Sequence, residues 1–138
     1  GYTYFNGTLH GNPVAAAATL AMLDELTNPD TYERLNQFAD DLCRESQQVL
    51  DRHGIPAIAC HTGSLWQILF MERVPENQSD MLAGDQAAMR RLDTELMKQG
   101  QYVLPGVRRF VSTVHTDQDL EETVSGLDEA CRAFSRTG

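Results

Sequence analysis

The sequence predicts an α/β (α+β) fold, in which helices cover one face of a small and mostly antiparallel sheet. Stretches with apolar residues at every third or fourth position alternate with short stretches that have them at every second position. Glycine and proline separate most of these stretches, as expected for turns and helix ends. Short strands joined by turns and helices are typical of such a sheet, so we expect the order α-α-β-β-α-β-β-α.

The composition excludes several classes of protein. A chain of 138 residues with 41% hydrophobic residues is long enough and apolar enough for one globular domain with a core. The net charge of −9 argues against binding to nucleic acid or to anionic membranes. The longest apolar run, residues 13–23, is too short and too rich in alanine to span a bilayer, and no signal-peptide pattern begins the chain.

Three cysteines, Cys43, Cys60 and Cys131, are widely spaced and form no C-x-x-C motif. We therefore expect reduced thiols of a cytoplasmic protein, without a disulfide framework. The four histidines show no metal-ligand spacing either, so we expect no metal site.

The first predicted helix spans residues 13–26 and follows a polar loop at residues 6–13. Asn12 is a good N-cap, and Pro13 suits the first helical position. The loop brings the hydroxyl of Thr8 and several backbone N–H groups near a helix N-terminus, which is the chemistry of a phosphate site. The alternative is a well-capped helix entry without a ligand. The helix is apolar nearly all round, so we expect it to lie buried between two domains or two subunits.

The remaining elements follow from periodicity and from cap and turn residues. Trp66 is interpreted as a core aromatic or as part of a pocket wall. Along the chain we predict a helix at 31–53 capped by Asp30, strands at 57–60 and 65–70, a loop at 72–84, a helix from Asp85 to Gly100, strands at 102–104 and 109–114 around a turn at Pro105-Gly106, and a last helix capped by Thr116 with Asp119.

The order of several motifs resembles a known family. The motifs are Gly7-Thr8-Leu9-x-Gly11-Asn12-Pro13 before the alanine-rich helix, Asn-Pro-x-x-Tyr-Glu-Arg-Leu at residues 28–35, Gly63-Ser64-Leu65-Trp66, and Phe110-Val111-Ser112-Thr113-Val114-His115-Thr116-Asp117 before the last helix. Together they resemble the class III, pyridoxal-phosphate-dependent aminotransferases, the group that includes glutamate-semialdehyde aminomutase. The resemblance covers nearly the whole chain, and its specificity lies in the order of the motifs.

The resemblance implies that the chain is the C-terminal third of a homodimeric enzyme with pyridoxal 5'-phosphate as its cofactor. Residues 1–29 would then be the cofactor loop and connecting helix at the end of the large domain, and residues 30–138 the small C-terminal α/β domain. It also implies that Thr8 reaches across the dimer to the cofactor phosphate, with backbone N–H groups at Gly7 beside it. His10 lies in the same loop and is a candidate substrate contact.

Arg108 and Arg109 form a second candidate site, because two guanidinium groups follow the predicted Pro-Gly turn. Arginine is a natural partner of a carboxylate, and the resemblance implies that an arginine of this domain binds a substrate carboxylate. The aminomutases have a longer loop with a glutamate here, whereas this loop is short and has no acid. That difference favours transamination of an amino or keto acid over the aminomutase reaction. The alternative is an exposed arginine pair.

The chain contains a single lysine, Lys98, near the end of a predicted surface helix. A Schiff-base lysine needs a desolvated pocket, which nothing around Lys98 suggests. We therefore expect no catalytic residue in this chain, and no activity from it alone, although the parent protein would be an enzyme. Two alternatives stay open: an aminomutase of the glutamate-semialdehyde type, and a non-catalytic α/β binding or oligomerisation module.

Overall fold

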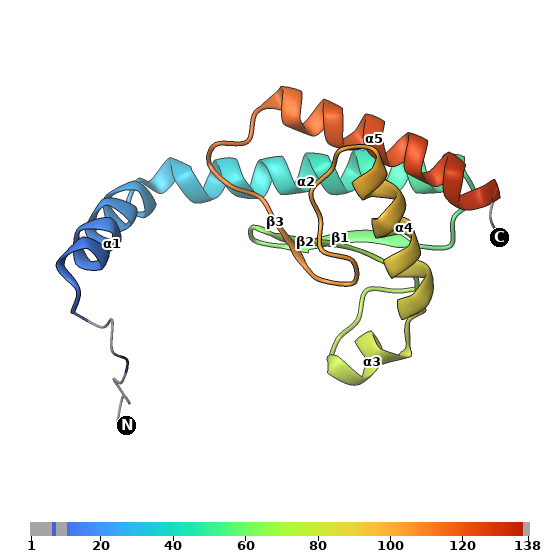
Figure 1. Cartoon of the computed structure of the whole chain (residues 1–138), viewed down its shortest axis with the longest axis horizontal. Helices are drawn as coiled ribbons and strands as arrows, with labels where there is room; N and C mark the ends of the chain where they lie inside the picture. The colour runs from blue at the N-terminus through green and yellow to red at the C-terminus, as the bar shows by residue number, and fades with distance from the viewer. Residues whose placement is uncertain (1–6, 8–10, 137–138) are drawn as a thin grey trace. The chain divides into compact units, whose positions relative to one another are not determined.

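A computed structural model of the chain describes residue 7 and residues 11–136 (Figure 1). The chain divides into two compact units, residues 1–33 and residues 34–138. The predicted boundary after residue 29 refers to a larger protein and stays a prediction. The elements are α1 (Pro13–Leu26), α2 (Pro29–Arg52), β1 (Ile58–Thr62), β2 (Leu65–Leu69), α3 (Gln78–Ala83), α4 (Gln86–Lys98), β3 (Arg109–Phe110) and α5 (Asp117–Arg136).

Helix α1 begins as predicted. The Oδ1 atom of Asn12 accepts a hydrogen bond from the backbone N–H of Val14 at 2.8 Å, and Pro13 is the first helical residue. No residue of α1 is buried within this chain, although the helix is apolar, and Leu20 is 64% exposed. The prediction that other domains or subunits cover α1 therefore stays a prediction.

Helix α2 begins two residues earlier than predicted, and Asp30 is not its cap. The side chain of Asn28 accepts from the backbone N–H of Asp30 at 3.1 Å, so Asn28 performs that role. Pro29 then occupies the first helical position, where its missing N–H costs nothing. Asn28 and Asp30 are both good cap residues, so local chemistry alone does not decide between them.

The three strands form one antiparallel sheet in the order β1-β2-β3. Thr62 pairs with Leu65 across a two-residue turn, in which Gly63 has a φ of 55°. Strand β1 therefore runs to Thr62, two residues beyond its predicted end, because the turn is shorter than expected. Trp66 of β2 pairs with Arg109 of β3.

Two predicted strands are wrong in whole or in part. Residues 102–104 form no strand: Tyr102 is 90% exposed and the backbone N–H of Val103 donates to the carbonyl of Gln101 nearby. The strand predicted at 109–114 is shortened to Arg109–Phe110, because residues 112–115 close a local turn instead. Alternating apolar residues predict a strand only where a neighbouring strand is available for pairing.

The segment predicted as a loop at 72–84 contains the short helix α3. Asn77 caps it, with its Oδ1 accepting from the backbone N–H of Asp80 at 3.0 Å. The order of elements is therefore α-α-β-β-α-α-β-α. A six-residue helix is too short for a periodic pattern to be recognised in the sequence.

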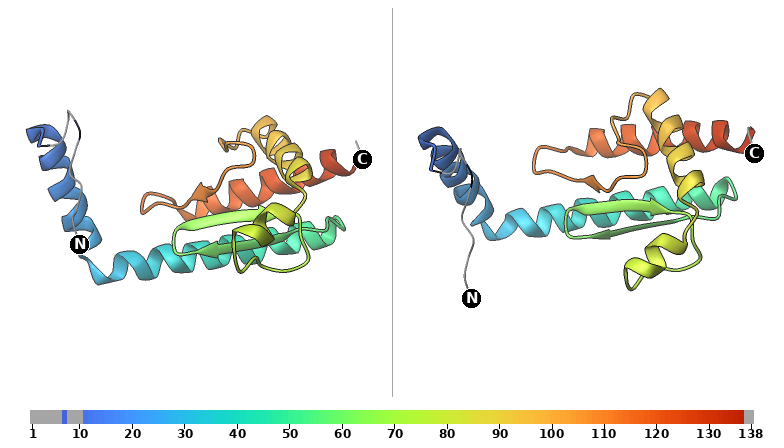
Figure 2. Two further views of the ribbon diagram at one scale, coloured as in Figure 1. Left: turned by 90° about the horizontal axis from the view of Figure 1, so that it is seen from below. Right: turned by 60° about the horizontal axis from the view of Figure 1, so that its bottom comes forward.

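The core of the second unit lies between the sheet and helices α2, α4 and α5. Helix α2 runs along the β1–β2 hairpin (Figure 2), where the side chain of Gln47 accepts from the backbone N–H of Ala59 at 2.9 Å. Helix α4 packs against α5. Helix α5 begins at the predicted capping box, since Thr116 and Asp119 hydrogen-bond each other. The largest apolar side chains with no appreciable exposure are Leu50, Ile68, Leu92, Leu96 and Leu127.

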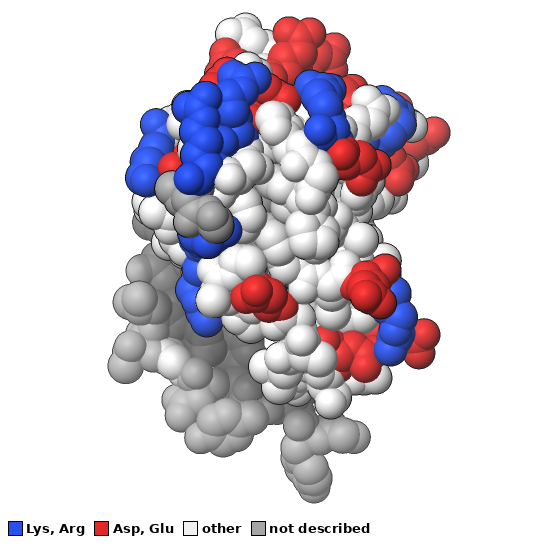
Figure 3. Space-filling model, turned by 90° about the vertical axis from the view of Figure 1, so that its right-hand side faces the viewer, with Lys and Arg blue, Asp and Glu red and all other residues white. Residues whose placement is uncertain are grey.

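Charged groups of both signs share the surface. On the face shown in Figure 3, acidic and basic side chains lie close together around an uncharged area. On α5, for example, Arg132 pairs with both Asp128 and Glu129. In the part of the chain that the structure describes, no helix has the length and apolar character needed to cross a membrane.

Candidate functional site

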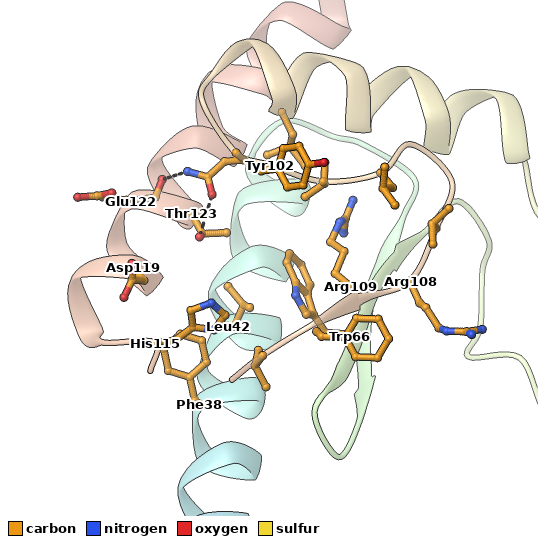
Figure 4. Close-up of a pocket in the computed structure, with 17 residues that line it drawn as sticks. Phe38, Leu42, Trp66, Tyr102, Arg108, Arg109, His115, Asp119, Glu122 and Thr123 are labelled. Carbon is orange, nitrogen blue, oxygen red and sulfur yellow. Dashed lines mark hydrogen bonds between the residues drawn. The ribbon is translucent and has the colours of Figure 1, made fainter. Parts of the chain in front are cut away.

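The second unit contains an open cavity of about 500 Å³ (Figure 4). Its lining comes from α2, β2, the segment 101–111 and the start of α5. Much of the lining is aromatic, whereas the start of α5 contributes polar groups. The aromatic side chains are Phe38, Trp66, Tyr102 and Phe110, and the polar ones from α5 are Asp119, Glu122 and Thr123.

Arg109 is the buried cation of this cavity. Its side chain leaves β3 on the same face as the paired Trp66, and its guanidinium carbon lies 4.6 Å from the centre of the indole ring. One amino group of the guanidinium, Nη2, donates to the carboxylate of Asp93 on α4. Arg109 is only 6% exposed and Asp93 has no exposed surface, so this is a buried ion pair.

The remaining guanidinium nitrogens of Arg109, Nε and Nη1, are buried and have no hydrogen-bond partner among the described residues. Burial lowers the pKa of Arg109, and the neighbouring carboxylate of Asp93 opposes that effect. An arginine remains charged under all ordinary conditions. Buried donors without a partner are rare in proteins. Arg109 lines the cavity, and two of its buried guanidinium nitrogens have no partner among the described residues.

The turn before Arg109 is held by the same carboxylate. The backbone N–H of Gly106 donates to Asp93 Oδ2 at 2.7 Å. Gly106 has a φ of 77°, in the left-handed region that favours glycine. A Cβ atom at this position would lie 2.9 Å from Cγ of Arg90. The Pro105-Gly106 turn is therefore where the sequence predicts it, and its glycine is required.

Arg108 lines the same cavity as Arg109 but differs from it in burial and in hydrogen bonding. It is exposed, and within residues 7 and 11–136 it makes no hydrogen bond or ion pair. Figure 4 shows its side chain pointing away from Trp66 and Tyr102, whereas Arg109 points between them. The two arginines therefore do not converge on one point in this chain. Each stays a predicted substrate contact, Arg109 as a buried donor and Arg108 as a free charge at the rim.

The rim of the cavity is built from hydrogen-bonded polar groups. The side chain of Gln101 donates to the carbonyl of Glu122 at 3.4 Å and accepts from the hydroxyl of Thr123 at 3.1 Å (Figure 4). The ring of His115 stacks on Phe38, with their centres 5.7 Å apart. The hydrogen bonds of Gln101 attach the segment after α4 to α5, and the stack of His115 on Phe38 attaches the segment before α5 to α2.

The predicted phosphate site is mostly beyond what the structure describes. Thr8 and His10 lie outside the described residues, and Gly7 is described only as exposed. These three stay predictions. Within residues 7 and 11–136, no group of three or more metal-ligating side chains is placed to hold a metal ion.

Lys98 lies at the exposed end of α4. Its side chain is 61% exposed, and its Nζ pairs with Glu95 at 2.7 Å. A lysine in this setting is exposed to solvent, whereas a Schiff-base lysine lies in a desolvated pocket. That no catalytic residue lies in this chain stays a prediction.

Sequence reasoning did not identify Asp93 as a candidate site residue. The spacing carried a usable signal, because Met89, Leu92, Asp93 and Leu96 follow the i, i+3, i+4, i+7 pattern of one helix face. An acid on such a stripe needs a buried partner, and Arg109 is that partner. Trp66, left open between core and pocket, serves as both.

Comparison with known proteins gives one consistent result. The chain matches no protein-family model. Over 138 residues it is 33% identical to the glutamate-1-semialdehyde 2,1-aminomutase of Limosilactobacillus reuteri subsp. reuteri (strain JCM 1112), covering 99% of this chain and 32% of that protein.

Solved structures share the fold. An omega-transaminase from Sphaerobacter thermophilus has a TM-score of 0.78 at 24% identity, covering 97% of this chain and 31% of the transaminase. A transaminase with PLP bound has a TM-score of 0.79 at 20% identity, covering 99% of this chain and 31% of that one. The chain thus spans about a third of the length of the relatives it matches.

The fold is that of the C-terminal part of pyridoxal-phosphate-dependent transaminases. Within that class, the chain matches the C-terminal part of aminotransferases and aminomutases, and it is similar to glutamate-1-semialdehyde 2,1-aminomutases over its whole length. The resemblance seen in the order of the sequence motifs is confirmed.

Proposed function

We propose that the whole protein is a pyridoxal-phosphate-dependent class III aminotransferase that acts on a small amino or keto acid. In this proposal the present chain supplies the wall that binds the substrate carboxylate, through Arg109 and Arg108. Gly7 and Thr8 contact the cofactor phosphate, and His10 lies near the substrate. The main support is the buried Arg109, whose Nε and Nη1 donors have no partner beside an aromatic cavity.

The described residues do not form a cofactor site by themselves. The one lysine is exposed and paired with Glu95, and the predicted phosphate contact at Thr8 lies outside the described residues. The electron-sink chemistry belongs to the cofactor, whereas the protein supplies binding and orientation. We therefore assign to this chain only substrate binding and cofactor contact, and we propose that it is inactive alone.

The whole protein is proposed to be a cytoplasmic homodimer with no nucleic-acid partner. The net charge of −9 supports the last point, because nucleic-acid backbones attract basic surfaces. A dimer would bring the loop that contains Thr8 to the cofactor of the other subunit. The exposed apolar residues of α1 are compatible with such an assembly.

A second candidate function is the glutamate-1-semialdehyde aminomutase reaction, because the matched protein of Limosilactobacillus reuteri has that name. The short segment between Pro105 and Phe110 counts against it, since it contains no acid. Both reactions move an amino group, but only transamination needs a separate keto acid as acceptor.

The test uses the full-length protein loaded with pyridoxal phosphate. Amino transfer from an amino acid should require a keto acid and give stoichiometric amounts of the new amino acid. Conversion of glutamate 1-semialdehyde without any acceptor would instead identify an aminomutase. Absence of both reactions, together with no cofactor uptake by the full-length protein, would contradict the proposal and favour a non-catalytic module.

A further inference from the structure

The carboxylate of Asp93 contacts the arginine turn at two points. Its Oδ1 accepts from Nη2 of Arg109, and its Oδ2 accepts from the backbone N–H of Gly106. These contacts lie on either side of residues 107 and 108. Because Asp93 belongs to helix α4 and has no exposed surface, the turn is attached to a rigid element of the core.

This attachment determines which donors of Arg109 remain without a partner among the described residues. With Nη2 bound to Asp93, the guanidinium plane is fixed against Trp66, and Nε and Nη1 are left without partners. Without the carboxylate, the long arginine side chain would regain several rotamers and could turn toward solvent. A buried carboxylate is also costly unless it is paired, so Asp93 and Arg109 stabilise each other in place.

We propose that Asp93 is the positioning residue of the substrate-carboxylate site. It does not contact substrate, but it holds Arg109 with Nε and Nη1 directed into the aromatic cavity and holds the turn that carries Arg108. The inference rests on the proposed function for its substrate, an amino or keto acid whose carboxylate binds at Arg109 and whose apolar part lies among Phe38, Trp66 and Tyr102.

The first test measures steady-state kinetics of the full-length holoenzyme. Asp93→Asn keeps one oxygen as an acceptor but removes the charge, and Asp93→Ala removes both contacts. We expect KM for the carboxylate substrate to rise in the order wild type, Asn, Ala, by roughly ten- to a hundredfold for Ala, the scale of a lost hydrogen bond to a charged group. The kcat should stay within about twofold, because the reacting atoms are not contacted.

Asp128→Asn is the matched control. Asp128 also joins a helix to cationic partners, Arg52, His53 and Arg132, and it does not line the cavity. If Asp93 contributed to fold stability and not to binding, Asp93→Asn and Asp128→Asn would change KM in the same way. A KM for Asp93→Asn equal to that of the wild type, or equal changes in the two variants, would overturn the proposal.

A second test does not depend on catalysis, and its first comparison uses the wild-type chain alone. In the 138-residue chain, 3-phenylpropionate should shift the ¹⁵N–¹H resonance of Arg109 Nε and change the fluorescence of Trp66, the single tryptophan. The neutral analogue 3-phenylpropionamide should do neither at the same concentration. For Asp93→Asn, the concentration of 3-phenylpropionate that gives half of the full response should be at least tenfold higher.

The two tests separate two kinds of failure. A full-length protein without amino transfer, whose isolated chain still binds 3-phenylpropionate through Arg109 in an Asp93-dependent way, would overturn the proposed function and support the role of Asp93. An Arg109 Nε resonance that 3-phenylpropionate does not move in the wild-type chain would overturn the role of Asp93, whatever the holoenzyme catalyses.

Discussion

At the scale of single residues, the molecule places its charges in two different settings. Asp93 and Arg109 form a buried pair beside a cavity, and removing either partner would leave the other as an uncompensated buried charge. Asp128 lies nearer the surface, where it joins α5 to the end of α2 through Arg52 and His53. We propose that the first pair serves a substrate site, whereas the Asp128 cluster links α5 with the end of α2.

The Asp128 cluster predicts a dependence of stability on acid. The hydrogen bond from His53 is the main cause that lowers the pKa of Asp128, with smaller contributions from the charges of His53, Arg132 and Arg52, while burial acts against them. The folded carboxylate therefore binds a proton less readily than the unfolded one. Its contribution is present above about pH 4 and is lost as pH falls through the lower folded pKa.

Asp128→Asn should therefore reduce the free energy of unfolding by about 1 kcal/mol at pH 7, and its difference from wild type should shrink below about pH 4. Urea unfolding at several pH values measures both. Glu129→Gln is the control, because Glu129 is 53% exposed and pairs only with Arg132, so it should change stability little. If the free energy of unfolding of Asp128→Asn were still below that of the wild type at pH 2, this explanation would be wrong.

At the scale of elements, the turn at residues 105–108 matters most, because it carries both arginines. Its conformation depends on Gly106, whose φ of 77° and whose closeness to Arg90 leave no room for a side chain. The backbone N–H of Gly106 also donates a hydrogen bond to Oδ2 of Asp93. The turn is therefore connected with α4 through both its backbone and its side chains.

Gly106→Ala should destabilise the chain by about 2 kcal/mol, through left-handed strain and displacement of Arg90. Gly63→Ala is the matched control, since Gly63 has a φ of 55° but no atom within 4 Å of an added Cβ. Gly63→Ala should reduce the free energy of unfolding by about 1 kcal/mol, from strain alone. Thermal unfolding of the two variants compares them, and equal losses would mean that the contact with Arg90 is harmless.

At the scale of the whole molecule, the core of the second unit controls the reactivity of its thiols. Burial is the main cause that raises the pKa of Cys43 and of Cys131 to about 12, and it also raises the pKa of the half-buried Cys60. Because the thiolate is the reactive form, these groups are protected by both access and ionisation.

We expect a maleimide at pH 8 to label Cys60 first, and Cys43 and Cys131 only as fast as the unit unfolds. Mass spectrometry of the labelled chain with time measures the three rates, and labelling in 8 M urea provides the reference for exposed thiols. Rapid labelling of Cys131 in the folded chain would show that α5 opens locally from the core.

Periodicity and cap residues were sufficient for the long helices. The start of α1 at Asn12-Pro13, the start of α4 at Asp85 and the capping box of α5 were all predicted from local chemistry that does not need the rest of the chain. The strand at 102–104 was predicted wrongly because pairing depends on distant residues. The three-residue stretch has a suitable pattern, yet no strand lies beside it.

The same distinction between local and long-range features applies to the candidate site. The candidate arginines, the turn before them and the family resemblance could be predicted from the sequence, because these depend on residue identity and short spacing. Only the tertiary structure decided that Arg109 is buried and Arg108 exposed, and that Asp93 holds Arg109 from a helix sixteen positions earlier. The physical reason is that burial and charge pairing arise between elements distant in the chain, so local pattern cannot specify them.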